Sequence, residues 1–184
     1  MKAYFCSEEF KYDGTQLRPL YAYSQFGILG DSIVAWVGEC NIHFEHMIDL
    51  EDVLDRSEIR GAKMLHFIVE LFDPGLIAGV ALQRLLASIV KDEIEKLQSK
   101  IHLRRDGDDL FHEDSKLSIS ICSKSSVSTM IHFAVNVNNQ GTPVKTFSLE
   151  DLRVDANKLA DAILNSFQKE YKSVLLATQK VKPL

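Results

Sequence analysis

Strict alternation of apolar and small polar residues in two neighbouring segments constrains the fold of this chain most. The first run covers residues 116–122 and the second covers 131–138, with a polar, Ser-rich segment at 123–129 between them. Side chains along a strand point to opposite faces in turn, so each run predicts a strand with one apolar and one polar face. A connection of this length predicts an antiparallel hairpin whose two apolar faces lie on the same side.

The polar face of this predicted hairpin carries small side chains around one lysine and one histidine. Small side chains leave room for a ligand to lie against the sheet, which gives a ligand-groove hypothesis. The alternative is an ordinary solvent-exposed sheet face, and the pattern alone does not separate the two. The members of this face are Lys116, Ser118, Ser120 and Cys122 on the first strand and His132, Ala134, Asn136 and Asn138 on the second.

Composition narrows the class of protein. The 184 residues suffice for one domain over residues 1–184 that needs no disulfide or metal to hold it together. The net charge of −5 and the mixing of basic with acidic residues argue against a nucleic-acid-binding protein. No apolar run approaches the ~20 residues of a membrane span, and no signal peptide is visible, so we expect a cytoplasmic protein. Three widely spaced cysteines favour reduced thiols.

The rest of the chain predicts further strands and helices around this hairpin. The acidic segment 45–63 predicts one or two short helical turns, and Gly141 and Pro143 predict a turn. We expect one edge strand or a short hairpin at 2–12, and strands at 33–44, 64–72 and 101–105. Short helices are expected at 19–26 and from 148, and long helices at 76–98 and from 155. Together they predict an α+β fold in which two long helices cover the apolar face of a mostly antiparallel sheet of about six strands.

The two long helices have amphipathic patterns that predict their buried faces. Asp73 is expected to cap the first helix, with Pro74 in its first turn. Its apolar stripe comprises Ile77, Val80, Ala81, Leu85, Ile89, Ile94 and Leu97, and Gln83, Arg84, Lys91 and Asp92 point away from it. The stripe of the second helix comprises Leu159, Ile163, Phe167, Tyr171 and Val174.

The central motif resembles one in the lipoate and biotin protein ligases and in the octanoyl transferases. In that superfamily a lysine opens one strand, and a nearby antiparallel strand carries a His and an Asn-Val motif. Here the chain reads Lys116-Leu-Ser-Ile-Ser-Ile and then Ile-His132-Phe-Ala-Val-Asn136-Val-Asn138. Gly107-Asp108-Asp109-Leu110 is similar to the Asn-Asp-Leu or Asn-Asp-Ile before the ligase lysine. The resemblance covers about residues 65–140 and implies a ligase-like fold of the class II synthetase type.

The resemblance also implies roles for individual residues. Lys116 would face a phosphate or a developing oxyanion and is the candidate catalytic residue. The implied cofactor is ATP with Mg²⁺, beside Asp108 and Asp109, for which turn formation or structural ion pairs with arginines are the alternative. The candidate ligand-binding residues are Ser118, Ser120, His132, Asn136, Asp108, Asp109 and Arg84.

The chain departs from the ligases in the segment before this motif. Where the ligases carry a glycine- and arginine-rich loop for the acyl group and the phosphate, residues 38–52 contain Glu45, Asp49, Glu51 and Asp52. These carboxylates repel a carboxylate or a triphosphate, which argues against acyl-adenylate formation. In addition, no cysteine stands where the octanoyl transferases have their nucleophile.

Over nearly its full length, the chain is most similar to an uncharacterised prokaryotic family, domain of unknown function 366. This resemblance implies a ligase-like fold and leaves the activity open. It rests on Glu-His-Met-Ile-Asp-Leu-Glu-Asp at 45–52, Met-Leu-His-Phe-Ile-Val-Glu-Leu-Phe-Asp at 64–73, Gln-Arg-Leu-Leu at 83–86, Gly-Asp-Asp-Leu at 107–110 and Lys-Leu-Ser-Ile-Ser at 116–120.

Three hypotheses for the function follow. The first is a domain that binds an acyl- or nucleotide-type small molecule on the polar face of the sheet and performs acyl transfer or carboxylate adenylation. The second is a non-catalytic binding or regulatory module of the same fold. The third is a metal-dependent enzyme that uses His43, His46 and His66 with nearby carboxylates. Assembly into a homo-oligomer is left open.

Overall fold

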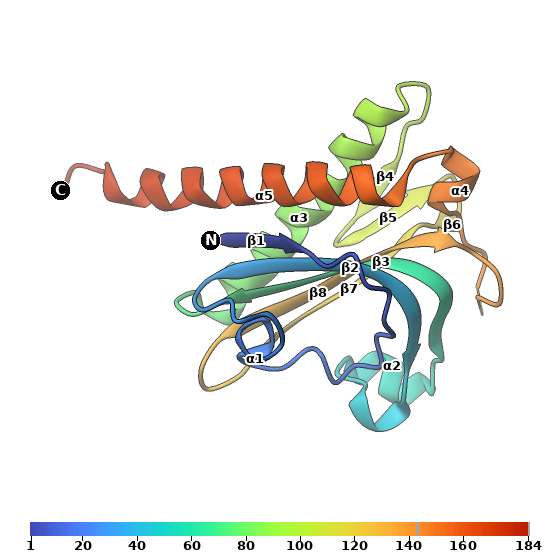
Figure 1. Cartoon of the computed structure of the whole chain (residues 1–184), viewed down its shortest axis with the longest axis horizontal. Coiled ribbons are helices and arrows are strands. Elements are labelled where there is room, and N and C mark those ends of the chain that lie inside the picture. Colours follow the sequence, from blue (N-terminus) through green and yellow to red (C-terminus); the bar gives the residue numbers. More distant parts are fainter. Residues whose placement is uncertain (143, 184) are drawn as a thin grey trace.

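The computed structural model describes residues 1–142 and 144–183, and its centre is a five-stranded sheet (Figure 1). The strand order is β1-β2-β3-β8-β7, in which β1 runs parallel to β2 and the other neighbours are antiparallel. These strands are β1 (Lys2–Phe5), β2 (Ser32–Ile42), β3 (Ile59–Leu71), β7 (Ser118–Lys124) and β8 (Thr129–Asn138).

Three further strands form a separate small sheet next to the edge strand β7. These are β4 (Arg104–Asp106), β5 (Asp109–His112) and β6 (Ser115–Lys116), all antiparallel. A backbone hydrogen bond of 2.8 Å from Leu117 N to Leu110 O ties β5 to the start of β7. The predicted single sheet of about six strands is therefore divided into a mixed sheet of five and a smaller sheet of three.

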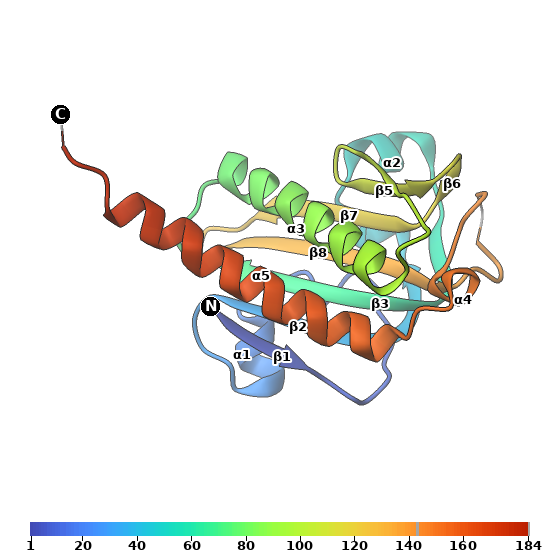
Figure 2. The ribbon, with the colours of Figure 1, turned by 90° about the horizontal axis from the view of Figure 1, so that it is seen from above.

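The helices lie on both sides of the large sheet. The long helices α3 (Leu76–Leu97) and α5 (Ala156–Gln179) cross one face, as predicted (Figure 2). The short α4 (Leu149–Leu152) precedes α5. On the other side lie α1 (Tyr21–Phe26), the 3-10 turn η1 (Phe44–His46) and α2 (Leu50–Asp55) (Figure 1). No described helix is long and apolar enough to cross a membrane.

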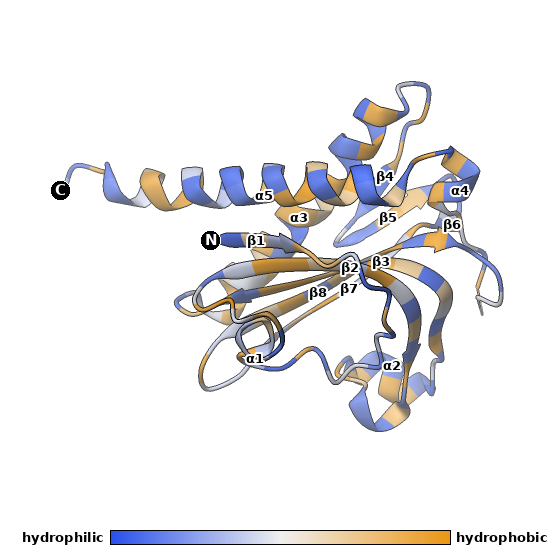
Figure 3. Cartoon of the chain, viewed as in Figure 1, coloured by the Kyte–Doolittle hydropathy of each residue, from blue (hydrophilic) through white to orange (hydrophobic). Residues whose placement is uncertain are grey.

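Both faces of the central strands are buried. Ala35 and Val37 of β2 contact the core beneath the two long helices, whereas Val34 and Trp36 join a second apolar cluster with residues of the N-terminal segment. Figure 3 shows the mostly apolar colouring of these strands. Strand β2 therefore has no exposed face along these residues, because the long helices cover one side and the chain before β2 folds back over the other. Gly38 permits this cover, since a Cβ there would lie 1.9 Å from Phe10 O.

The central hairpin forms, but the two apolar faces of its strands do not share a side. Ile121 pairs with His132, and Ser120 pairs with Phe133. Paired residues share a face, so the serines of β7 lie on the helix-covered face and His132 lies on the other. The predicted common polar face is wrong because the pairing register, which alternation within one strand does not report, decides which faces meet. The residues split in this way are Ser118, Ser120 and Cys122 on one side and His132, Ala134 and Asn136 on the other.

Helix α3 buries only part of the predicted stripe: Ile94 is buried and Ile89 packs against the core, but most of the buried residues are others. Its N-cap is Gly75, so Asp73 and Pro74 precede the helix. Ile77, expected in the stripe, is 88% exposed. Apolar residues cover much of this helix, so periodicity leaves the choice of face open. The buried residues are Gly79, Gln83, Leu86, Ala87, Val90, Glu93 and Ile94.

Helix α5 buries the predicted stripe up to Tyr171. Val174 is 37% exposed, because the helix continues beyond the sheet (Figure 1). The segment 45–63 is helical only at η1 and α2, and β3 already begins at Ile59. The predicted turn at Gly141 and Pro143 includes Pro143, which lies outside the described residues.

Candidate functional site

A cavity of about 450 Å³ opens beside β7. Its walls come from the turn between β4 and β5, from β7 and β8, and from the segment 46–60 with α2. Thr142, Val144 and Thr146 complete the lining on the C-terminal side of β8. These segments are far apart in sequence, so only the tertiary fold brings them together. Six of the predicted site residues line the cavity: Asp108, Asp109, Lys116, Ser118, Ser120 and Asn136. His132 and Arg84 do not.

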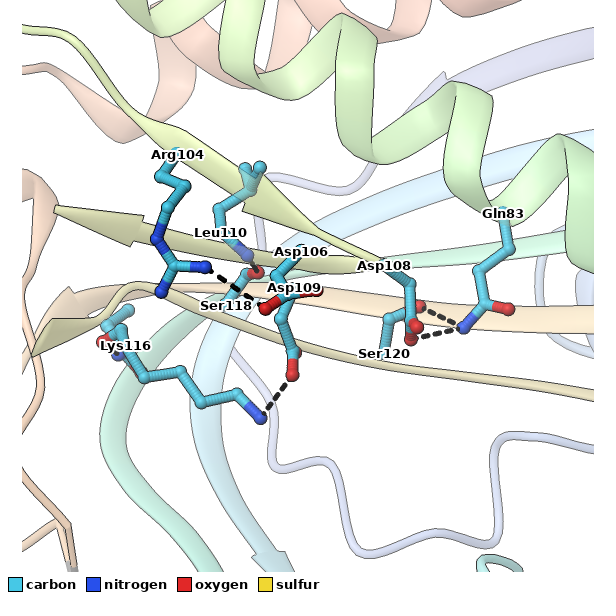
Figure 4. A network of polar contacts seen from close by, with 10 residues as sticks. Gln83, Arg104, Asp106, Asp108, Asp109, Leu110, Lys116, Ser118 and Ser120 are labelled. Atoms are coloured by element: carbon cyan, nitrogen blue, oxygen red, sulfur yellow. Dashed lines mark hydrogen bonds and ion pairs between the residues drawn. The ribbon is translucent and has the colours of Figure 1, made fainter. Parts of the chain in front are cut away.

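Lys116 and Asp109 form an ion pair in the cavity wall. Lys116 Nζ lies 2.7 Å from Asp109 Oδ2 (Figure 4). The tight turn at Gly107, with φ of +61°, leads into β5 and places Asp109 opposite Asp106. Burial raises the pKa of Asp109, while the hydrogen bond and charge of Lys116 act in the opposite direction. An incoming anion would therefore share Lys116 with a carboxylate that is already in place.

Gln83 of α3 connects two further residues of the cavity wall. Its Nε2 donates to Asp108 Oδ2 at 2.7 Å and to Ser120 Oγ at 2.8 Å (Figure 4). Ser120 Oγ in turn donates to His132 O at 2.9 Å. The sequence pattern placed Gln83 on the solvent side, so this residue was missed. Its spacing of four from Gly79 is the signal that could have found it, because a glycine often marks close packing of a helix against a sheet.

Ser118 and Asn136 hold the strands around the cavity in place. Ser118 Oγ accepts a hydrogen bond of 2.9 Å from Leu110 N. Asn136 Nδ2 donates to Lys116 O and to Phe147 O, both at 3.2 Å. Since two carbonyl oxygens require donors, these contacts fix the orientation of the Asn136 amide and leave its Oδ1 as an acceptor.

His132 lies in the core, where it pairs with His66 instead of lining a groove. His66 Nε2 lies 3.3 Å from Gly38 O and His66 Nδ1 lies 3.1 Å from His132 Nε2. Burial lowers the pKa of His66 to about 3 and the pKa of His132 well below its ordinary value, so both are neutral. The carbonyl requires a proton on His66 Nε2, hence His132 Nε2 donates to His66 Nδ1. Tyr12 stacks on His132 with ring centroids 3.7 Å apart.

Arg84 and the three histidines of the metal hypothesis do not form the sites predicted for them. Arg84 is exposed on α3 and forms no ion pair with the described carboxylates. His66 is buried in the core, His43 is exposed before η1, and His46 is half-buried at the edge of the cavity. Within residues 1–142 and 144–183, no three His, Cys, Asp or Glu side chains come together to hold a metal. The metal-enzyme hypothesis therefore loses its set of ligands.

Cys122 is not activated as a nucleophile. Burial, with a smaller contribution from the charge of Asp108, raises the pKa of its thiol to about 11. A thiol with this pKa is protonated at neutral pH, and the thiolate is the reactive form. The side chain packs beside Gly79 of α3, so its role is in packing.

The acidic segment before β3 forms the remaining wall of the cavity. Asp49, Glu51 and Asp52 at the start of α2 all line it. The Asp49 side chain caps α2 by accepting a hydrogen bond of 2.9 Å from Glu51 N. Neither Glu51 nor Asp52 forms an ion pair with any part of the chain that the structure describes. This wall therefore presents uncompensated negative charge.

The family model "Domain of unknown function (DUF366)" matches residues 1–182. A curated relative, the uncharacterized protein MJ0805 of Methanocaldococcus jannaschii, is 37% identical over 191 residues, covering 100% of this chain and 86% of that protein. A solved protein of unknown function from Pyrococcus horikoshi has a TM-score of 0.94 and 35% identity, covering 100% of this chain and 98% of the other. Both relatives thus match this chain over its whole length, one in sequence and the other in sequence and fold.

More distant solved structures share the fold at low identity. Biotin protein ligase from Aquifex aeolicus, in complex with biotin and ATP, gives a TM-score of 0.61 at 16% identity, covering 93% of this chain and 70% of the ligase. A lipoate-protein ligase A bound with ATP gives a TM-score of 0.56 at 13% identity, covering 92% of this chain and 85% of the ligase. The chain belongs to the DUF366 family, and its fold is that of the biotin and lipoate protein ligases.

Proposed function

We propose that the cavity beside β7 binds a small molecule with an acyl or phosphate group, and that Lys116 contacts its anionic oxygen. The observation that carries this proposal is the position of Lys116 in the wall of a cavity of about 450 Å³, a volume suited to a small organic ligand. The structurally similar biotin protein ligase binds biotin and ATP. That likeness supports a small-molecule ligand here without naming it.

The reaction that fits Lys116 best is acyl transfer. A carbonyl carbon under attack develops negative charge on its oxygen, and a fixed ammonium stabilises that charge. ATP with Mg²⁺ fits the same residues poorly. Asp108 and Asp109 offer oxygen ligands, but they already accept short bonds from Gln83 and Lys116. The carboxylates of α2 would in addition repel a triphosphate, so we derive no step through the nucleotide.

The second candidate is a binding module without catalysis. Two observations favour it over an enzyme. The Cys122 thiol is unreactive at neutral pH, and Lys116 is neutralised by Asp109. An assay with an activated acyl compound, in which chromatography detects any new product, distinguishes the two candidates. Turnover would support the transferase, and binding without turnover would support the binding module.

The first test is native mass spectrometry of gently purified protein beside the same protein denatured. A retained acid or phosphate compound in the native sample supports the proposal. Isothermal titration with butyrate, caproate and octanoate then compares the wild type with Lys116→Ala. The matched control is Lys124→Ala, since Lys124 is an exposed lysine at the end of the next strand, β7, and outside the cavity.

We expect Lys116→Ala to weaken carboxylate binding about tenfold, equal to ~1.4 kcal/mol, and Lys124→Ala to leave it unchanged. Equal affinity of Lys116→Ala and wild type would remove Lys116 from the site. A wild-type protein that retains no small molecule after purification and binds none of the three carboxylates would contradict the proposal as a whole.

A further inference from the structure

Negative charge dominates the wall of the cavity. Six carboxylates line it, against the two permanent cations Arg60 and Lys116. Both cations are already neutralised, because Arg60 pairs with Glu58 at 3.2 Å and Lys116 pairs with Asp109 at 2.7 Å. The carboxylates that line the cavity without an ion-pair partner in the described chain are Asp49, Glu51, Asp52 and Asp108.

Two polar atoms in the same wall, on residues that are almost fully buried, have no partner within the described chain. Tyr12 is 1% exposed and its hydroxyl makes no hydrogen bond, and Asn136 is 4% exposed with a free Oδ1. The one described polar side-chain atom that is both sealed from solvent and unpartnered is Ser32 Oγ. The two atoms of the cavity wall therefore remain accessible to a molecule inside it. Both atoms can therefore hydrogen-bond to a ligand in the cavity without breaking a bond within the described chain.

Apolar side chains also line the cavity. Ile119 and Ile121 of β7 and Met64 of β3 contribute aliphatic side chains between the polar walls. These residues favour a ligand with a hydrocarbon body. The α2 wall and the small sheet that carries Asp109 and Lys116 lie on different sides of the strands (Figure 1), so the polar groups of the ligand are addressed from two directions.

We infer that the ligand of this cavity is an aliphatic amino acid or a derivative of one. Its ammonium group would lie at the α2 carboxylates and its acyl end at Lys116. The inference rests on the proposed function for the acyl end and goes beyond it for the ammonium. Because the uncompensated carboxylates attract a cation through a partly desolvated space, a simple fatty acid or a nucleotide is disfavoured there. The Tyr12 hydroxyl and Asn136 Oδ1 supply hydrogen bonds to the ligand.

Three probes of equal chain length test this inference by isothermal titration at low salt. ε-Aminocaproate carries both end groups, caproate lacks the ammonium, and hexylamine lacks the carboxylate. We expect ε-aminocaproate to bind the wild type about tenfold more tightly than caproate. The ammonium should account for this difference, since both probes place the same carboxylate at Lys116.

A pair of substitutions on α2 locates the ammonium. Asp52→Asn removes a carboxylate that lines the cavity, whereas Asp55→Asn makes the same change in charge on the same short helix, outside the cavity. Asp52→Asn should weaken ε-aminocaproate binding about threefold or more, whereas caproate, which this carboxylate repels, should bind no more weakly than to the wild type. Asp55→Asn should affect neither probe.

The outcomes separate this inference from the proposed function. Caproate that binds as tightly as ε-aminocaproate would overturn the ammonium site and leave the role of Lys116 standing. Hexylamine that binds as tightly as ε-aminocaproate, with no binding of caproate, would support the ammonium site and overturn the anion site at Lys116. Equal losses in Asp52→Asn and Asp55→Asn would reveal a general field effect and contradict a local contact, and no binding of any probe would contradict both proposals.

Discussion

Asp109 neutralises Lys116 across 2.7 Å in the cavity wall. The pair is partly shielded, with 32% of the Lys116 side chain and 28% of the Asp109 side chain exposed. A free lysine would attract anions strongly, whereas this pair presents little net charge. The affinity of the cavity for an anion is therefore set by Asp109 as much as by Lys116.

Removing the charge of Asp109 should strengthen anion binding. We expect Asp109→Asn to bind hexanesulfonate about tenfold more tightly than the wild type, because Lys116 no longer shares its charge. Asp106→Asn is the matched control, since Asp106 is exposed on the same hairpin and outside the cavity. Titration calorimetry measures both. A weaker sulfonate affinity in Asp109→Asn would show that Asp109 holds Lys116 in its binding position.

The same pair predicts how anion binding varies with pH. Burial raises the pKa of Asp109, so its carboxylate takes up a proton at a higher pH than an ordinary aspartate. As the pH falls through that raised pKa, Lys116 is released and hexanesulfonate, which stays ionised, should bind more tightly. Asp109→Asn should lack this rise. A wild-type affinity that does not change on acidification would argue against the coupling.

The buried His66–His132 pair should make the fold sensitive to acid. Both pKa values are lowered in the folded protein, that of His66 to about 3, so the unfolded chain binds protons first as the pH falls below its ordinary value of ~6.5. The stability is thus complete above that value and lost on acidification towards the folded pKa. We expect the free energy of unfolding in urea to fall by about 2 kcal/mol between pH 7 and pH 5.5.

A variant of His132 tests the origin of this acid sensitivity. His132→Gln keeps a donor for His66 Nδ1 and removes one titrating group, so it should reduce the pH slope by about half. His43→Gln, at an exposed position, should leave the slope as it is. A slope that is the same in all three proteins would assign the effect to other groups.

Gly79 should be indispensable for the packing of α3 on the sheet. A Cβ at this position would lie 2.4 Å from Thr129 Cγ2 and 2.9 Å from Cys122 Sγ. We expect Gly79→Ala to lower the free energy of unfolding by about 1–3 kcal/mol through overpacking, despite the better helix propensity of alanine. In Gly75→Ala the new Cβ meets nothing within 4 Å, so this variant should lose only the ~0.5–1 kcal/mol that alanine costs at an N-cap. A stabilised Gly79→Ala protein would refute the close contact.

Glu70 should stabilise the loop before α1 through its buried carboxylate. Its Oε1 accepts hydrogen bonds of 2.6 Å from both Leu20 N and Ser128 Oγ, and Leu20 has a left-handed backbone with φ of 61°. Glu70→Gln replaces charge-assisted bonds with weaker ones and should cost about 1–3 kcal/mol in chemical denaturation. Glu8→Gln at an exposed position serves as the control, and equal stability of both variants would show that the network contributes little.

Patterns within single segments determined much of the fold. Alternation located β7 and β8, periodicity located α3 and α5, and the stripe of α5 from Leu159 to Tyr171 is buried as predicted. The motif around Lys116 indicated the ligase-like fold, and the family resemblance is confirmed. These features follow from the sequence because backbone geometry repeats at short, fixed intervals along the chain.

Only the tertiary structure decided how these elements meet. Because Ile121 pairs with His132, the His132 side chain points into the core. The close approach of α3 to the sheet at Gly79 determines which face of the helix is buried, and Gln83 lies on that face. The cavity joins α2, the β4–β5 turn and β7, three segments that share no local pattern. Register and packing depend on contacts between distant residues, so short-range periodicity carries no information about them.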